Sequence, residues 1–184
     1  MRLSFTALLI CAVPLMAQNR EIDTARSTIT IHVGKAGLLS AAGHEHWVSA
    51  PISTGFVSES ESRVEFTVEA AKMRVKPDPK IDEKTQATIQ KDMEEMTLDI
   101  AHFREIKFQS TRVEKSPAGW NVTGTLSLHG ASKPVTVLVK REGESYTGRT
   151  ILKQTDFGIK PISVGGGMVK IKNEIDIEFQ IYPR

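Results

Sequence analysis

Cysteine is almost missing from this chain of 184 residues, which contains only Cys11. Cys11 lies within the first 17 residues, and these have the pattern of a leader that is removed after export. The mature chain would then contain no thiol. Disulfides, thiolate nucleophiles, thiolate-bound zinc and iron–sulfur clusters are therefore excluded as the basis of its function.

An excess of charge of one sign is also missing. The 24 lysines and arginines balance 22 aspartates and glutamates, and the net charge is +2. Because the basic residues are spread among acidic ones, the sequence shows no footprint for nucleic acid. Beyond the leader, no apolar run approaches the ~20 residues that a membrane-spanning helix needs, so we expect no transmembrane segment in the mature chain.

The leader itself is the stretch "MRLSFTALLICAVPLMA". A basic Arg2 precedes an apolar run from Leu8 to Met16, and Ala17 offers a small residue for cleavage. This layout predicts a secretory signal peptide at residues 1–17, followed by a single domain at 18–184. We therefore expect a periplasmic or secreted protein.

The mature chain is dominated by apolar and polar residues that alternate with a period of two. In "VKIKNEIDIEFQI" at 169–181, isoleucine, valine and phenylalanine share one face, and charged or amide side chains share the other. Such alternation is typical of a strand with one dry face, here about 40 Å long at roughly 3.3 Å per residue. Similar strands, eight or nine in all, are predicted at 27–33, 63–69, 120–128 and 134–140 and near 51–57, 106–114 and 145–153.

One helix is predicted at residues 82–97, "DEKTQATIQKDMEEMT". Asp82 is a suitable N-cap, and the segment contains neither glycine nor proline. Ile89, Met93 and Met96 recur at helical spacing, and we expect the two methionines to form a buried stripe.

An all-β chain of this size has to protect its sheet edges. It can close into a barrel or split into two stacked sheets, and the long last strand favours a closed antiparallel barrel of about eight strands. Alternation alone cannot separate a hollow barrel from a filled one. A filled barrel that works through protein contacts therefore stays open as an alternative.

Three further segments carry a resemblance to a known family. They are "FQSTRVEK" at 108–115, "GWNVTGTLSLHGASKPVTVLV" at 119–139 and "TDFGIKP" at 155–161. From Arg20 onward the chain resembles the YceI-like family of exported bacterial proteins. The resemblance implies a lipocalin-like barrel with a helix near one end, whose apolar lumen binds polyisoprenoid or other long amphiphilic lipids.

The combined prediction is a binding protein rather than an enzyme, with no cofactor of its own. It would hold a polyisoprenoid, a quinone or a related lipid in the lumen, for transport or storage. Asn173 is in phase with the apolar face of the last strand and could be a polar anchor. The predicted lumen residues are Val64, Phe66, Val68, Val122, Leu126, Val135, Val137, Asn173, Ile175, Ile177 and Phe179.

The stretch "AAGHEHWVSAP" at 41–51 permits a rival function. On a strand, His44 and His46 would point the same way, with Glu45 opposite. They could be structural groups of the wall or rim, polar contacts to a ligand, or two ligands of a metal. The metal alternative would make the chain a metal-binding protein or a metal-dependent enzyme. The sequence does not predict the oligomeric state.

Overall fold

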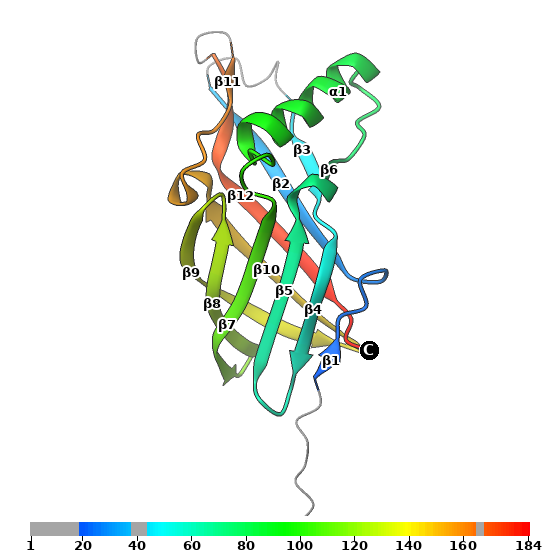
Figure 1. Cartoon of the computed structure of the whole chain (residues 1–184), viewed down its shortest axis with the longest axis vertical. Helices are drawn as coiled ribbons and strands as arrows, with labels where there is room; N and C mark the ends of the chain where they lie inside the picture. The colour runs from blue at the N-terminus through cyan, green and yellow to red at the C-terminus, as the bar shows by residue number, and fades with distance from the viewer. Residues whose placement is uncertain (1–18, 38–43, 165–167) are drawn as a thin grey trace, which may run out of the picture.

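The computed structural model describes residues 19–37, 44–164 and 168–184, and the described part is one antiparallel sheet with a single long helical segment (Figure 1). Eleven strands follow the order β1-β4-β5-β7-β8-β9-β10-β12-β2-β3-β6, and β11 pairs with β12 alone. The strands are β1 (Arg20–Glu21), β2 (Thr28–Ala36), β3 (His46–Ser49), β4 (Ile52–Ser58), β5 (Arg63–Glu69), β6 (Arg74–Val75), β7 (Glu105–Ser116), β8 (Gly119–Leu128), β9 (Ala131–Glu142), β10 (Ser145–Lys153), β11 (Ser163–Val164) and β12 (Val169–Ile181).

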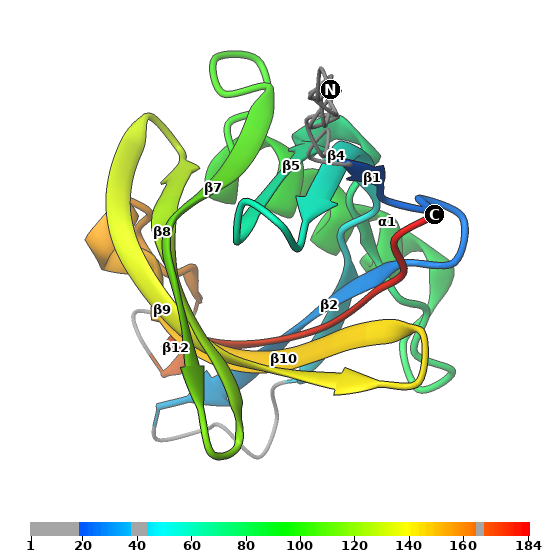
Figure 2. The same cartoon turned by 90° about the horizontal axis from the view of Figure 1, so that it is seen from below.

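The mostly-β prediction is confirmed, but the predicted closed eight-stranded barrel is wrong. The sheet is a strongly curled half-barrel (Figure 2). Its ladder has two ends, at β1 and β6. The ladder breaks between β3, which pairs with β2 and β6, and β4, which pairs with β1 and β5. Pro51 lies at this break and has no N–H with which to continue a ladder.

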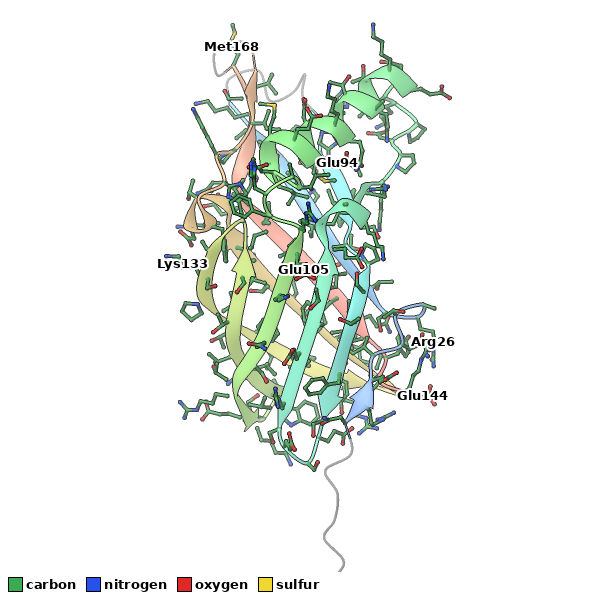
Figure 3. The ribbon with its side chains drawn as sticks, viewed as in Figure 1. Arg26, Glu94, Glu105, Lys133, Glu144 and Met168 are labelled. Carbon is green, nitrogen blue, oxygen red and sulfur yellow. The ribbon has the colours of Figure 1, made fainter. Side chains whose placement is uncertain are left out.

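The start and end of the described chain meet at one rim. Ile22 forms a bridge with Pro183, and the Asp23 amide donates to the Tyr182 carbonyl at 2.7 Å. On the outer surface nearby, Arg26 lies 3.3 Å from Glu144 (Figure 3). These contacts hold the rim together where the ladder itself is not closed.

Alternation located the long strands well. The last strand spans the predicted Val169–Ile181, with a register shift between Ile171 and Ile175. The two-residue strands β1, β6 and β11 were not predicted, because two residues cannot show a period of two.

The predicted helical segment is confirmed in its extent, but its last turn is of another type. Helix α1 spans Glu83–Asp92, and Oδ1 of its N-cap Asp82 accepts from the Thr85 amide at 3.0 Å. A π-helical turn, Met93–Thr97, follows, and the Leu98 amide donates to the Met93 carbonyl at 2.9 Å. This turn adds one residue, so Met93 and Leu98 are buried while Met96 is 63% exposed. The prediction of a buried Met96 is therefore wrong.

The buried side chains form two apolar clusters on the concave side of the sheet. The larger one includes Val68, Phe157 and Ile159, and the smaller one is built from Phe108, Val122, Val137 and Val139. Three half-buried side chains pack against both clusters, and these are Phe66, Leu126 and Phe179.

Candidate ligand-binding cavity

The concave side of the sheet encloses a cavity of about 390 Å³. This lumen is lined mainly by aliphatic and aromatic side chains of the long strands. The helical segment lies across the end drawn uppermost in Figure 1 and contributes Met93 and Leu98 to the wall. The volume falls in the range of about 300–1,000 Å³ that is usual for small-molecule sites. The interior is therefore hollow rather than filled by its own side chains.

Charge is confined to the ends of the lumen. Among the described residues that line it, only Glu59, Arg63 and Lys153 carry a charge. Glu59 directly follows β4, Arg63 begins β5, and Lys153 ends β10. A long ligand would therefore meet mainly hydrocarbon along its length and charged groups only near its ends.

The polar group at one end is a hydrogen-bonded network. The Tyr146 hydroxyl donates to Oε1 of Glu59 at 2.7 Å, and the same oxygen lies 3.6 Å from Arg20 and 3.9 Å from Arg141. Burial raises the pKa of Tyr146, and its bond to the Glu59 carboxylate raises that pKa further. The phenol therefore stays protonated at neutral pH and acts as a hydrogen-bond donor.

The predicted lumen residues, with one exception, lie on the cavity wall. Their inward direction follows from the period of two, which places alternate side chains on the concave face. Those on the wall are Val64, Phe66, Val68, Val122, Leu126, Val135, Val137, Ile175, Ile177 and Phe179.

Asn173 is the exception, and it does not line the cavity. It lies within the register shift of β12, where its Oδ1 accepts from the Thr155 amide at 3.0 Å and its Nδ2 donates to the Thr155 hydroxyl at 2.9 Å. The amide therefore fastens the turn after β10 to the last strand. Alternation placed Asn173 inside because it cannot foresee a shift of register.

We expect Asn173→Ala to lower the free energy of unfolding by about 1 kcal/mol, because two partly exposed hydrogen bonds are lost. Uptake of an apolar probe should not change. Chemical denaturation and probe titration measure the two effects. The matched control is Asn121→Ala on the exposed face of β8, which should change stability by less than about 0.5 kcal/mol. A loss of probe binding in Asn173→Ala alone would restore the polar-anchor prediction.

The two histidines of the "GHEH" stretch do not line the cavity. His44 is exposed and precedes β3, whereas His46 is half-buried opposite Val33. Burial lowers the pKa of His46, and the nearby His44 lowers it further while Asp78 acts in the opposite direction. The imidazole of His46 is therefore biased toward its neutral form. Contact between these histidines and a ligand stays a prediction.

Glu45 and Trp47 instead face outward. Oε2 of Glu45 lies 3.1 Å from Nε2 of His32, whose ring stacks on Trp47 with a centroid separation of 4.5 Å. Trp47 itself is 45% exposed, so the outer wall carries a small patch made of these three side chains.

The described part of the chain offers no third metal ligand beside His44 and His46. Across residues 19–37, 44–164 and 168–184, no group of three histidine, cysteine, aspartate or glutamate side chains is arranged to hold a metal ion. In the same ranges no helix is long and apolar enough to cross a bilayer. The predicted signal peptide lies outside the described residues.

Several lining residues escaped the sequence analysis. Trp120 and Val139 were in phase with predicted wall residues, so alternation could have included them. On β10 the inward positions are Tyr146, Gly148, Thr150 and Leu152, and the first three are too weakly apolar to show the alternation. Phe157 and Ile159 also line the cavity, but they lie outside any strand, where periodicity gives no signal.

These features define a hollow β-protein, a curled antiparallel sheet around an apolar lumen with polar ends. The chain belongs to the YceI-like domain family, whose model matches residues 21–182, and the resemblance seen in the sequence is thereby confirmed.

Two curated relatives match parts of the chain. A UPF0312 protein of Pseudomonas savastanoi pv. phaseolicola is 34% identical over 94 residues, which cover 45% of this chain and 47% of that protein. A UPF0312 protein of Yersinia pestis is 43% identical over 47 residues, which cover 26% of this chain and 24% of that protein. The matches thus span about half of the relatives' length or less.

Two solved structures share the fold. A polyisoprenoid binding domain from Saccharophagus degradans, implicated in plant cell wall breakdown, has a TM-score of 0.61 at 11% identity, with 91% of this chain and 99% of that one covered. BcnA of Burkholderia cenocepacia has a TM-score of 0.56 at 18% identity, with 87% and 98% covered. At these identities the likeness shows the fold alone.

Proposed function

We propose that this chain is an exported binding protein that holds a long apolar or amphiphilic ligand in its lumen, for transport or storage. Polyisoprenoids, quinones and related lipids are the ligand class. The observation that carries the proposal is the 390 Å³ cavity, whose wall is apolar except at its ends. Export to the periplasm or the medium is part of the proposal and rests on the leader pattern of residues 1–17.

Burial is sufficient to explain binding of such a ligand. Each methylene that moves from water into an apolar site gains about 0.8 kcal/mol, so a chain of a dozen carbons could gain roughly 10 kcal/mol before the costs of binding. The charged groups at the two ends would meet the ligand's polar end or solvent. The Saccharophagus degradans polyisoprenoid binding domain supports the ligand class because it has the same fold.

The proposed mechanism needs no chemical step. In the described wall of the lumen there is no histidine, cysteine or aspartate, and the Tyr146 phenol is held by Glu59. Such a wall can exclude water and select a shape, and the one carboxylate among its described residues, Glu59, is held by Tyr146, Arg20 and Arg141. We therefore propose a carrier and not an enzyme.

The test is mass spectrometry of organic extracts from protein purified under native conditions. We expect a lipid with a long hydrocarbon chain at near-stoichiometric amount, absent from an unrelated exported protein purified in the same way. Elemental analysis of the same sample distinguishes the metal alternative. A preparation that is free of lipid, and that fails to take up prenyl alcohols or quinones when they are offered, would overturn the proposal.

A further inference from the structure

Two inward-facing glycines of the lumen wall lie beside phenylalanine rings that line the cavity. Gly124 lies between Val122 and Leu126 on β8, and Gly148 lies between Tyr146 and Thr150 on β10. Glycine inside a strand costs about 0.5–1 kcal/mol relative to alanine, because the unfolded chain gains freedom and no side chain packs. A requirement for space above the backbone explains why glycine occupies these two positions.

That space is occupied by two phenylalanine rings. A Cβ on Gly124 would lie 2.4 Å from Cζ of Phe108, and a Cβ on Gly148 would lie 2.4 Å from Cζ of Phe179. Both rings also line the cavity. Each ring is therefore seated on a bare stretch of backbone, against the wall rather than across the lumen.

The seated rings lie where the two interior clusters meet. Phe179 packs against both clusters, and so does Phe66, which stacks on Phe108 with a centroid separation of 5.5 Å. An apolar chain that runs the length of the lumen has to pass these rings. Their distance from the wall thus controls the width of the passage.

We infer that Gly124 and Gly148 set the width of the lumen. The wider lumen would favour methyl-branched chains, such as prenyl chains, over straight alkyl chains. This inference rests on the proposed function and names its specificity-determining positions. A ring seated on glycine leaves room for the branch methyls. A methyl group beneath it would push the ring inward by about 1 Å, since carbon atoms prefer separations of roughly 3.5–4.0 Å.

Gly148→Ala is the sharper test of the two positions. At Gly148 the close atoms belong to the free end of the Phe179 ring, and the nearest backbone atom is the Leu138 carbonyl oxygen at 3.1 Å. At Gly124 the Gln109 carbonyl oxygen would lie at 2.5 Å, so alanine there would strain the sheet itself. We expect Gly148→Ala to weaken binding of geranylgeraniol about tenfold, and binding of the straight-chain alcohol of equal carbon number less than about twofold.

The affinities are measured by displacement of an apolar fluorescent reporter from the mature protein, and circular dichroism checks the fold. Adding Phe179→Leu to Gly148→Ala removes the displaced ring and should restore the wild-type ratio of the two affinities. Phe179→Leu alone should shift the ratio of the two affinities toward the prenyl alcohol. This variant therefore tests the inference even if Gly148→Ala does not fold.

The outcomes separate this inference from the function beneath it. If the wild-type protein binds neither alcohol, the proposed function fails. If it binds them but the ratio does not move in Gly148→Ala or in Phe179→Leu, the function stands and the inference is overturned. Equal losses for both alcohols would also overturn it, because a lumen of selective width must distinguish them.

Discussion

Replacing Ile177 by glutamate is expected to weaken binding of an apolar ligand by roughly 100-fold. Ile177 lies on the cavity wall within β12, between Ile31 of β2 and Thr150 of β10. When an apolar ligand binds, a carboxylate at this position loses water and contacts hydrocarbon instead. This desolvation should reduce the free energy of binding by about 3 kcal/mol. Titration of the folded variant with a fluorescent prenyl or fatty alcohol measures the loss.

The matched control applies the same change to the other side of the wall. Ile151 on β10 is 63% exposed and lies opposite Asp176. Ile151→Glu should leave ligand affinity unchanged, although the like charges cost up to about 1 kcal/mol of stability. The proposed lumen would be in error if Ile177→Glu, shown to be folded, bound the probe as tightly as Ile151→Glu does.

Ile159→Ala is expected to give a large loss of stability, about 3 kcal/mol in the free energy of unfolding. Ile159 follows the 3-10 turn Gln154–Phe157 and is only 4% exposed. Its amide donates to the Gln154 carbonyl at 3.1 Å, so the backbone holds the side chain in place and a cavity would remain after truncation. Thermal unfolding should show a decrease in Tm of roughly 6–12 °C.

The control for this change is again Ile151, in the same stretch of chain. Ile151→Ala should alter the free energy of unfolding by less than about 0.5 kcal/mol, because its side chain is already in water. Ile159→Ala keeps the wall apolar, so ligand affinity of the folded protein should fall far less than in Ile177→Glu. Similar Tm values for the two alanine variants would show that the "TDFGIKP" segment does not anchor the wall.

The long strands could be predicted because one face of each is dry and the other wet. The alternation of β5, β8, β9 and β12 also identified part of the cavity wall, since alternate side chains along a strand point to the same face of the sheet. The rule of alternate faces gave the wrong direction for Asn173, because a register shift turns its side chain toward Thr155. It also could not find Phe157 and Ile159, which reach the cavity from a turn.

The helix shows the same limit. Asp82 and the absence of glycine and proline predicted where it begins, because capping is a local interaction. The buried face of the helical segment depended on a π-turn. This turn shifts the spacing of the buried residues by one and leaves Met96 exposed. Which side chains enter the lumen was therefore decided by packing against the sheet.

By itself, the sequence determined that the chain is mostly β and that its long strands have one apolar face, because these properties depend on neighbouring residues in the chain. Only the tertiary structure decided that the sheet stays an unclosed half-barrel and that its interior is hollow. Both depend on contacts between residues far apart in the chain. The ladder is interrupted at Pro51 because β3 and β4 pair with different neighbours, and the rings of Phe108 and Phe179 lie against the wall because glycines of other strands lie beneath them.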